Sequence, residues 1–428
     1  MTAILPQLFA ETRAGVVGLG RSGVAAARLL LAAGARVRLI DQQESRCREV
    51  AAALAQETGG GASDLVDMAF GPHHPGQFEG LDLVIMSPGV AVAKIRPFLP
   101  PVNPPQVLAE MELASRFVQA PILAVTGTSG KTTTVTLAAR MLESAGKKVF
   151  LGGNIGTPLA EFVLSGETAD VLVLEISSFQ LQTCTTFHPR VGVFLNLAPN
   201  HLDYHEDMDE YLAAKCMLFA HQTAEDVAVI HASLRPLLET RGGLKATVRW
   251  FDEQAELSAG ALLGAHNRAN VQAAYLATSF FGVTRAQAQT TVDAFAPLPH
   301  RIQPVGEVKG VLFVNDSKAT TPDAMAAAIR SMERPVRLLA GGVFKGGDLT
   351  ELLPLLKEHV KQVALFGANR EVFEQAWQGA VPLSWDDTLE AATRRLFAAA
   401  TPGDVILLSP ATASSDRYSS YTERGRDF

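Results

Sequence analysis

The chain has 428 residues, of which 47% are hydrophobic and 19% charged, and its formal net charge is −7. This composition predicts a folded chain of about two to three domains, and its net negative charge argues against a general nucleic-acid or membrane-binding surface. Three cysteines without C-x-x-C spacing predict neither a disulfide framework nor a zinc site.

The N-terminal segment "MTAILPQLFAETRAG" has no basic stretch followed by a long apolar core. No uninterrupted apolar run in the chain approaches the length that a membrane-spanning helix needs. We therefore expect a cytoplasmic protein without a membrane partner.

The first predicted unit is "AGVVGLGRSGVAAARLLLAAGARVRLID": a short strand, the turn Gly18-x-Gly20-x-x-Gly23, a helix, and a strand that ends at Asp41. This order is typical of a mononucleotide-binding βαβ unit. Taken alone, the glycine pattern and the acidic residue favour a dinucleotide-dependent dehydrogenase. A later strand, 83–86, leads into Ser-Pro-Gly, and the proline-rich segment "RPFLPPVNPPQ" is the first predicted linker.

The second segment opens with "PILAVTGTSGKTTTV", in which an apolar strand enters a glycine-containing turn and a helical pattern that ends at Gly146. Gly127 and Gly130 let backbone N–H groups converge on phosphate oxygens, Lys131 supplies a charge, and the Thr132 hydroxyl can reach Mg²⁺. The strict phosphate-loop pattern would have glycine at position 125, where this chain has valine. Nucleotide binding is the favoured interpretation, and a simple glycine turn is the alternative.

Two further groups of polar residues follow strands of this segment. The strand in "ADVLVLEISSFQL" delivers Glu175 at its end, and a later strand precedes "NHLDYH" and a helix that contains Lys215. The carboxyl edge of such a sheet is where ligands bind, and a carboxylate there suits Mg²⁺ beside phosphate oxygens. The histidines of "HLDYH" could instead form a zinc cluster, and a helical lysine is more often a solvated surface residue.

The third segment begins near residue 298 and repeats this arrangement. "VNDSKATTPDA" places several polar groups between a strand and a helix start at Pro322, and other strands lead to Lys345 and Ser414. Taken alone, "NDSKATTPD" is better explained as a well-capped helix start without a ligand.

Seven motifs occur in collinear order over almost the whole chain: "TGTSGKTTT", "GGNIGTPL", "LEISSFQL", "NHLDYH" with "AAK" downstream, "GAHNRANVQAA", "HRIQPVGEVKGVLFVNDSKATTPDA" and "LLSPATASSDRYSSYTERG". Together they resemble the Mur ligases, whose phosphate loop lacks the first glycine, and the last two are most similar to those of the D-glutamate-adding members. The resemblance implies an α/β protein of three domains. These are a Rossmann-like UDP-binding domain (1–103), a central ATP-binding domain with a phosphate loop and a mostly parallel sheet (104–297), and a Rossmann-like amino-acid-binding domain (298–428).

The resemblance also implies the reaction. An ATP-dependent ligase of peptidoglycan precursor synthesis would join the carboxylate of UDP-N-acetylmuramoyl-L-alanine to the amine of D-glutamate through an acyl phosphate, and we expect it to be a monomer in the cytoplasm. The implied catalytic residues are Lys131, Glu175, His201 and Lys215. One Mg²⁺ would be held by Thr132 and Glu175, and a second by His201 and by Lys215 as a carbamate.

The implied binding sets are larger. ATP would be bound by Gly127, Thr128, Ser129, Gly130, Lys131, Thr132, Thr133, Asn267, Asn270, Arg301 and Asp316. The UDP substrate would be bound by Gly20, Arg21, Ser22, Asp41, Ser87, Gly89, Asn154, Ser177, Gln180 and His201. D-glutamate would be bound by Lys318, Thr320, Lys345, Ser414 and Tyr421.

The resemblance replaces the dehydrogenase interpretation of the first glycine pattern with binding of a uridine diphosphate. Two rival ligases remain. A folylpolyglutamate-type ligase shares the phosphate loop but would not need a separate N-terminal nucleotide-binding domain, and another Mur ligase would add a different amino acid. A non-catalytic nucleotide-dependent binding protein is the alternative from another class.

Overall fold

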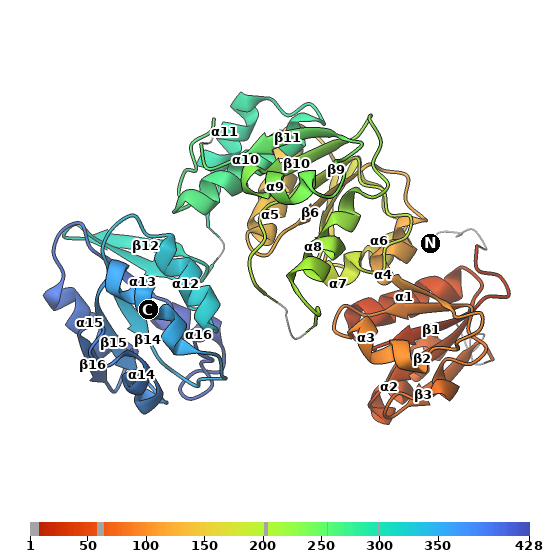
Figure 1. Ribbon diagram of the computed structural model, residues 1–428, viewed down its shortest axis with the longest axis horizontal. Coiled ribbons are helices and arrows are strands. Elements are labelled where there is room, and N and C mark those ends of the chain that lie inside the picture. Colours follow the sequence, from red (N-terminus) through yellow and green to blue (C-terminus); the bar gives the residue numbers. More distant parts are fainter. Residues whose placement is uncertain (1–7, 58–63, 201–203, 255, 298) are drawn as a thin grey trace. The chain divides into compact units, whose positions relative to one another are not determined.

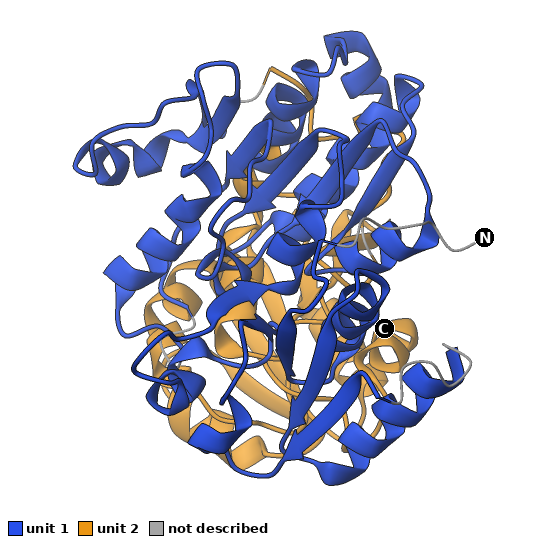
Figure 2. Cartoon of the chain, turned by 90° about the vertical axis from the view of Figure 1, so that its right-hand side faces the viewer, with its two compact units in different colours: residues 1–254, 269–291 blue, residues 255–268, 292–428 orange. Residues whose placement is uncertain are grey.

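The computed structural model describes residues 8–57, 64–200, 204–254, 256–297 and 299–428. Within it the chain divides into two compact units, one of residues 1–254 with 269–291 and one of residues 255–268 with 292–428 (Figure 2). The division falls inside helix α10 (Ala265–Ser279), so this helix belongs partly to each unit.

The first unit contains two parallel sheets (Figure 1). The first sheet has the order β3-β2-β1-β4-β5, and all of its neighbouring strands are parallel. Its strands are β1 (Arg13–Val17), β2 (Arg36–Asp41), β3 (Val66–Phe70), β4 (Leu83–Met86) and β5 (Gln106–Ala109). The associated helices are α1 (Arg21–Ala32), α2 (Glu44–Glu57), α3 (Val92–Ile95) and α4 (Glu110–Ser115), with the short turns η1 (Pro75–Gln77) and η2 (Arg96–Phe98).

The second sheet has the order β11-β10-β9-β6-β8-β7 and is also entirely parallel. Its strands are β6 (Ile122–Thr126), β7 (Val149–Gly153), β8 (Val171–Glu175), β9 (Val191–Phe194), β10 (Val227–His231) and β11 (Thr247–Phe251). The helices are α5 (Lys131–Ser144), α6 (Leu159–Ser165), α7 (Ser178–Leu181), α8 (Met208–Cys216), α9 (Arg235–Glu239), α10 and α11 (Arg285–Asp293), with η3 (Met217–Phe219) and η4 (Ala232–Leu234). Strands β6, β8 and β9 are buried at every residue, as expected for parallel strands covered on both faces.

One hydrophobic core joins the two sheets of the first unit. Helices α1, α4 and α6 pack on one another, and Leu29, Leu113 and Leu159 from these helices belong to the same buried cluster as the strand residues. The glycine pattern and the phosphate loop are therefore carried by one continuous core.

The second unit is built on a sheet of order β12-β13-β17-β14-β15-β16, in which only β12 runs antiparallel to its neighbour among the described strands. Its strands are β12 (Gln303–Val308), β13 (Val311–Asn315), β14 (Val336–Ala340), β15 (Val360–Phe366), β16 (Leu383–Asp386) and β17 (Val405–Leu408). Its helices are α12 (Pro322–Arg330), α13 (Leu353–His359), α14 (Arg370–Trp377), α15 (Leu389–Ala399) and α16 (Tyr421–Asp427), with η5 (Leu349–Leu352). Two buried clusters of apolar residues stabilise this sheet.

The fold class expected from the sequence is confirmed: each sheet is of the α/β type and the central one is wholly parallel. The domain boundaries at residues 103 and 297 stay predictions. Strand β5 follows the proline-rich segment and pairs with β4, so the first sheet extends past residue 103.

Candidate active site

The phosphate loop lies at the carboxyl end of β6 and leads into α5. Gly127 and Gly130 have φ values of 154° and 82°, a region that side chains other than glycine rarely adopt. A Cβ on Gly130 would lie 2.4 Å from Asn270 Oδ1, so Asn270 packs directly against the loop. Helix α5 begins at Lys131, immediately after Gly130, so its first N–H groups are available to an anion at the loop.

Two lysines meet at one carbonyl oxygen of this loop. Lys131 Nζ donates to Gly127 O at 2.8 Å and to Thr128 O at 3.0 Å, and Lys215 Nζ donates to the same Gly127 O at 3.0 Å. Lys215 is 1% exposed, and its Nζ lies 4.5 Å from the centre of the Tyr211 ring. Burial, with a smaller effect of the Lys131 charge, lowers the pKa of Lys215 to about 6. The interpretation of Lys215 as a solvated surface lysine is therefore wrong.

Glu175 brings a second set of groups to the same edge of the sheet. Thr132 Oγ1 donates to Glu175 Oε2 at 2.8 Å, and Asn154 Nδ2 donates to Glu175 Oε1 at 3.1 Å. Glu175 is 3% exposed. A hydroxyl and a carboxylate held together beside a phosphate loop form an all-oxygen donor set, which fits Mg²⁺.

Asn196 is a residue that the sequence interpretation missed. It follows β9, and its Oδ1 accepts hydrogen bonds from the N–H groups of Thr128 at 3.0 Å and Ser129 at 2.9 Å. Its Nδ2 donates to Ser129 O at 3.2 Å. The rule that polar residues after parallel strands gather at one edge would have identified it.

The predicted UDP-binding residues of the first sheet lie around the β1–α1 turn. Asp41 Oδ2 accepts a hydrogen bond from the N–H of Leu19 at 2.9 Å and so closes the glycine turn. Arg21 forms a two-pronged ion pair with Glu161, at 3.1 Å and 2.8 Å, and donates to Gly156 O. Gly20 is the N-cap of α1, which contains Ser22, and Ser87 and Gly89 follow β4.

The other predicted contacts to this substrate lie in the second sheet. Ser177 and Gln180 form a capping box at the start of α7, so their side chains have a structural partner in each other. His201 lies outside the described residues. His205, from the same motif, is 1% exposed and its Nε2 lies 2.9 Å from Ser178 Oγ. The described residues contain no group of three His, Cys, Asp or Glu side chains that could hold a metal ion.

The second unit holds the remaining predicted residues. Asp316 is 6% exposed and accepts hydrogen bonds from Ser409 Oγ at 3.0 Å and from the N–H of Ile302 at 3.2 Å. Burial outweighs these bonds and raises the pKa of Asp316 to about 7. Arg301 is exposed, and the Asn267 amide donates to Leu263 O at 2.8 Å.

The predicted D-glutamate residues lie on segments that follow three strands of the second unit and on α16. Lys318 and Thr320 follow β13, Lys345 follows β14, and Ser414 follows β17. Lys318 Nζ lies 5.5 Å from the centre of the Tyr421 ring, the first residue of α16. Lys318 and Lys345 are exposed.

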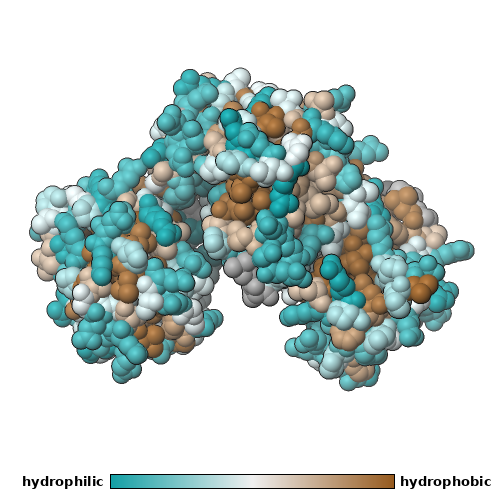
Figure 3. Space-filling model, viewed as in Figure 1, coloured by the Kyte–Doolittle hydropathy of each residue, from teal (hydrophilic) through white to brown (hydrophobic). Residues whose placement is uncertain are grey.

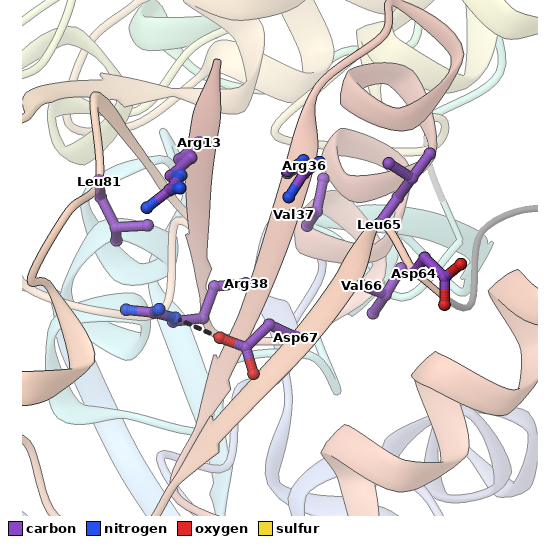
Figure 4. A pocket seen from close by; sticks show the side chains of 9 residues that line it. All are labelled: Arg13, Arg36, Val37, Arg38, Asp64, Leu65, Val66, Asp67 and Leu81. Carbon is purple, nitrogen blue, oxygen red and sulfur yellow. Dashed lines mark hydrogen bonds and ion pairs between the residues drawn. The ribbon is translucent and has the colours of Figure 1, made fainter. Parts of the chain in front are cut away.

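A pocket of about 190 Å³ lies at the opposite, amino edge of the first sheet. Figure 4 shows Arg13, Arg36 and Arg38 near the starts of neighbouring strands, with Arg38 paired to Asp67 at 2.8 Å. Arg13 and Arg36 are exposed to solvent. The pocket is remote from the strand ends that carry the predicted UDP-binding residues, and it belongs to no predicted site.

Polar and charged side chains cover most of the face drawn in Figure 3, with small apolar patches between them. Among the described helices, none has the length and apolar character required to cross a membrane.

Three family profiles match the chain in the order of its sheets. They are described as "Mur ligase MurD-like, N-terminal domain" (residues 12–97), "Mur ligase middle domain" (residues 125–236) and "Mur ligase, glutamate ligase domain" (residues 300–412). These matches cover more than half of the sequence, and the chain therefore belongs to the Mur ligase family.

Within the family, the chain is similar to proteins named as D-glutamate ligases. The UDP-N-acetylmuramoylalanine--D-glutamate ligase of Oleidesulfovibrio alaskensis is 56% identical over 417 residues, which cover 96% of this chain and 92% of that protein. The protein of the same name from Nitratidesulfovibrio vulgaris (strain DP4) is 54% identical over 414 residues, with coverages of 96% and 94%.

Two solved structures share the fold at low sequence identity. The MurF ligase of Thermotoga maritima in complex with ADP aligns with a TM-score of 0.58 and 18% identity, covering 97% of this chain and 94% of that one. E. coli FolC in complex with ADP aligns with a TM-score of 0.52 and 16% identity, covering 74% of this chain and 91% of that one.

Proposed function

We propose that this chain is an ATP-dependent ligase that joins D-glutamate to UDP-N-acetylmuramoyl-L-alanine in peptidoglycan precursor synthesis. The observation that carries the proposal is the 56% identity to a D-glutamate ligase over 96% of the chain. The convergence of Lys131, Glu175 and Lys215 on the edge of the central sheet supports it further.

The first chemical step activates a carboxylate, which is a poor electrophile because it is anionic and has no good leaving group. The substrate carboxylate oxygen attacks the γ-phosphorus of ATP, the bond to the β,γ-bridging oxygen breaks, and an acyl phosphate and ADP result. Two anions must meet in this step, so catalysis depends mainly on positioning and on charge stabilisation. In our proposal Gly127, Thr128, Ser129, Gly130 and Thr133 line the phosphates, and Lys131 supplies the positive charge.

The second step forms the amide. The amine of D-glutamate attacks the acyl carbon, a tetrahedral intermediate forms, and phosphate leaves while the amine loses its proton. In our proposal Lys318, Thr320, Lys345, Ser414 and Tyr421 bind D-glutamate, because lysine and hydroxyl groups are suitable donors to its two carboxylates.

In our proposal the remaining residues bind the nucleotide and the UDP substrate. Asn267, Asn270, Arg301 and Asp316 would line the nucleotide. Gly20, Arg21, Ser22, Asp41, Ser87, Gly89, Asn154, Ser177, Gln180 and His201 would line the UDP substrate. The turn closed by Asp41 offers backbone donors at a helix N-terminus, which suit a diphosphate.

The metal sites rest on the donor atoms present. Thr132 and Glu175 form a hard oxygen pair at 2.8 Å, and these are the residues that would hold one Mg²⁺. Bound there, Mg²⁺ would neutralise charge on the phosphate oxygens as it builds up. His201 and Lys215 would hold a second.

Lys215 would take part as a carbamate. A neutral amine adds CO₂ and releases a proton, which turns a cationic side chain into an anionic oxygen ligand. The surroundings of Lys215 support this role, since a buried ammonium beside Lys131 is unfavourable. A carbamate there would replace repulsion from Lys131 by attraction.

A phosphate-release assay tests the proposed function. Purified protein is given ATP, Mg²⁺ and UDP-N-acetylmuramoyl-L-alanine, with D-glutamate, L-glutamate, meso-diaminopimelate or L-lysine in parallel reactions. We expect phosphate release only with D-glutamate, together with a product whose mass equals the sum of both substrates less one water.

Other outcomes would reject it. Release with another amino acid alone would make the chain a different Mur ligase. Nucleotide binding without any release would favour the non-catalytic alternative. The expectations of a monomer and of a cytoplasmic location stay predictions, which light scattering and cell fractionation would test.

A further inference from the structure

The C-terminal helix α16 carries a guanidinium group that is completely buried. Arg424 is 0% exposed, its Nε donates to Ser317 Oγ at 3.0 Å, and its Nη2 donates to Ser317 O at 2.8 Å and to Thr412 O at 3.0 Å. Its Nη1 is also buried and has no hydrogen-bond partner in the part of the chain that the structure describes. Each of these acceptors is neutral, so the buried charge has no carboxylate bonded to it among the described residues.

The acceptors of Arg424 lie on the segments predicted to bind D-glutamate. Ser317 directly precedes Lys318, and its Oγ also donates to Tyr421 O at 2.8 Å. Thr412 lies two residues before Ser414. The guanidinium therefore connects the segment after β13, the segment after β17 and helix α16.

The segment after β14, which carries Lys345, meets the same group. Val343 and Ala413 exchange two backbone hydrogen bonds of 2.9 Å, which join this segment to the one after β17. Gly342 has a φ of 123°, and a Cβ there would lie 2.7 Å from Thr412 Oγ1 and 3.3 Å from Arg424 Nη1. All four segments thus pack closely around one side chain.

Burial of the Arg424 guanidinium is not explained by packing alone. Moving a guanidinium group out of water is costly, and an apolar side chain of similar volume would fill the space without that cost. Burial lowers the pKa of Arg424 to about 10, so the group keeps its charge at neutral pH. The negative charge of Asp416 acts against the effect of burial, although Arg424 donates its hydrogen bonds only to Ser317 and Thr412 among the described residues.

We propose that Arg424 is a positioning residue for the amino-acid substrate. Its guanidinium holds the four segments that carry Lys318, Lys345, Ser414 and Tyr421 in one geometry, through its hydrogen bonds to Ser317 and Thr412 and its close packing against Gly342. This inference rests on the proposed function, because it takes D-glutamate as the ligand of these segments.

The test uses the full-length protein and steady-state kinetics in which each substrate is varied in turn. Arg424→Met removes the charge and the hydrogen bonds, Arg424→Lys keeps the charge without the planar fork, and Arg426→Met is the matched control on an exposed arginine of the same helix. We expect Arg424→Met to lower kcat/KM for D-glutamate by ~10²-fold, the scale of a misplaced binding group. KM for ATP and for the UDP substrate should change less than about threefold. Arg424→Lys should keep about a tenth of the wild-type kcat/KM for D-glutamate, because a tenfold loss corresponds to one lost hydrogen bond. The control should match wild type.

An unchanged KM for D-glutamate in folded Arg424→Met would overturn the inference, as would equal losses for all three substrates. If Arg424→Met does not fold, Arg424→Lys alone tests the inference. Wild-type kinetics in Arg424→Lys would then reject the positioning role of Arg424. Failure of the proposed function looks different, because the wild-type protein itself would then show no phosphate release with D-glutamate.

Discussion

The phosphate loop of the first unit and the segments of the second unit predicted to bind D-glutamate are two candidate sites that are built in different ways. We call these segments, which carry Lys318, Lys345, Ser414 and Tyr421, the D-glutamate segments. The loop is one continuous stretch: β6 ends, two glycines allow the turn, and α5 starts at Lys131. Its ligand groups are mostly backbone N–H groups whose positions follow from this local geometry.

The D-glutamate segments have no such continuity. They come from after β13, β14 and β17 and from α16, and they are held in place by the buried guanidinium of Arg424. Each segment alone is an ordinary loop or a capped helix start.

The difference shows where mutations should act. In the first unit, we expect the loop to keep its conformation when a reactive side chain is removed, because its glycines and the β6–α5 connection remain. In the second unit, a residue that contacts no substrate should affect binding, because tertiary contacts define the site.

The largest effect is expected for Lys131→Ala. The change removes the charge that we propose faces the phosphates and leaves Gly127 and Gly130 in place, so ligation should fall by at least ~10³-fold, the scale of charge-stabilising groups. Phosphate-release kinetics measure this loss, and a thermal unfolding curve like that of wild type should accompany it.

Lys148→Ala is a suitable control, since it removes an exposed lysine of the same unit. Near-normal turnover of a folded Lys131→Ala variant would remove the assignment of the phosphate loop as the ATP site.

Lys215→Ala should reduce activity by ~10²-fold, in the range found for groups that orient or ligate at a metal centre. Small carboxylic acids added to the medium should partly restore activity, because they place an oxygen anion in the vacated space. Alanine at this buried position also removes one of the two lysine hydrogen bonds to Gly127 O.

The same hypothesis predicts a dependence on CO₂. The pKa of Lys215 lies near 6, so below that pH the amine is protonated and cannot add CO₂. Preincubation without substrate in CO₂-free buffer at mildly acidic pH should therefore lower activity, and bicarbonate should restore it. Unchanged turnover of Lys215→Ala at limiting Mg²⁺ would show that the lysine is no metal ligand.

The sequence predicted the fold class and the elements that carry local patterns. The strand at 83–86, the helix that starts at Lys131 and the helix that starts at Pro322 are all found at the expected residues. Continuous apolar strands followed by glycine turns are typical of parallel α/β units, so this part of the fold needs no tertiary information.

The remaining features depend on contacts between distant residues. Asn196 bonds to Ser129 across 67 positions, and Arg424 bonds to Ser317 across 107. A local pattern also does not reveal that Lys215 is buried, because its short helix has no distinct apolar face. Its hydrogen-bond partner Gly127 lies 88 positions away in the sequence.

Asn196→Ala tests whether the loop of the first unit is as independent of tertiary contacts as its sequence suggests. The variant leaves the N–H groups of Thr128 and Ser129 without their acceptor, so we expect KM for ATP to rise about tenfold, the cost of one lost hydrogen bond. Asn196→Asp keeps the acceptor but adds negative charge near the phosphates and should be worse. A lower KM for ATP in Asn196→Ala would mean that Asn196 competes with the nucleotide for these N–H groups.

The smallest effect is expected at Arg21, where a predicted substrate contact coincides with an ion pair to Glu161. An exposed ion pair contributes little to stability because solvent screens it, so the free energy of unfolding should hardly change in Arg21→Ala or in Glu161→Gln. The two variants should differ in catalysis. If Arg21 binds the diphosphate, Arg21→Ala raises KM for the UDP substrate by about fivefold, on the scale of one solvent-exposed charge contact, whereas Glu161→Gln releases the arginine and leaves KM unchanged or lower. Equal KM values in both variants and wild type would make Arg21 a structural residue that joins α1 to α6, and the diphosphate would then depend on the backbone donors of the Gly18–Gly23 turn.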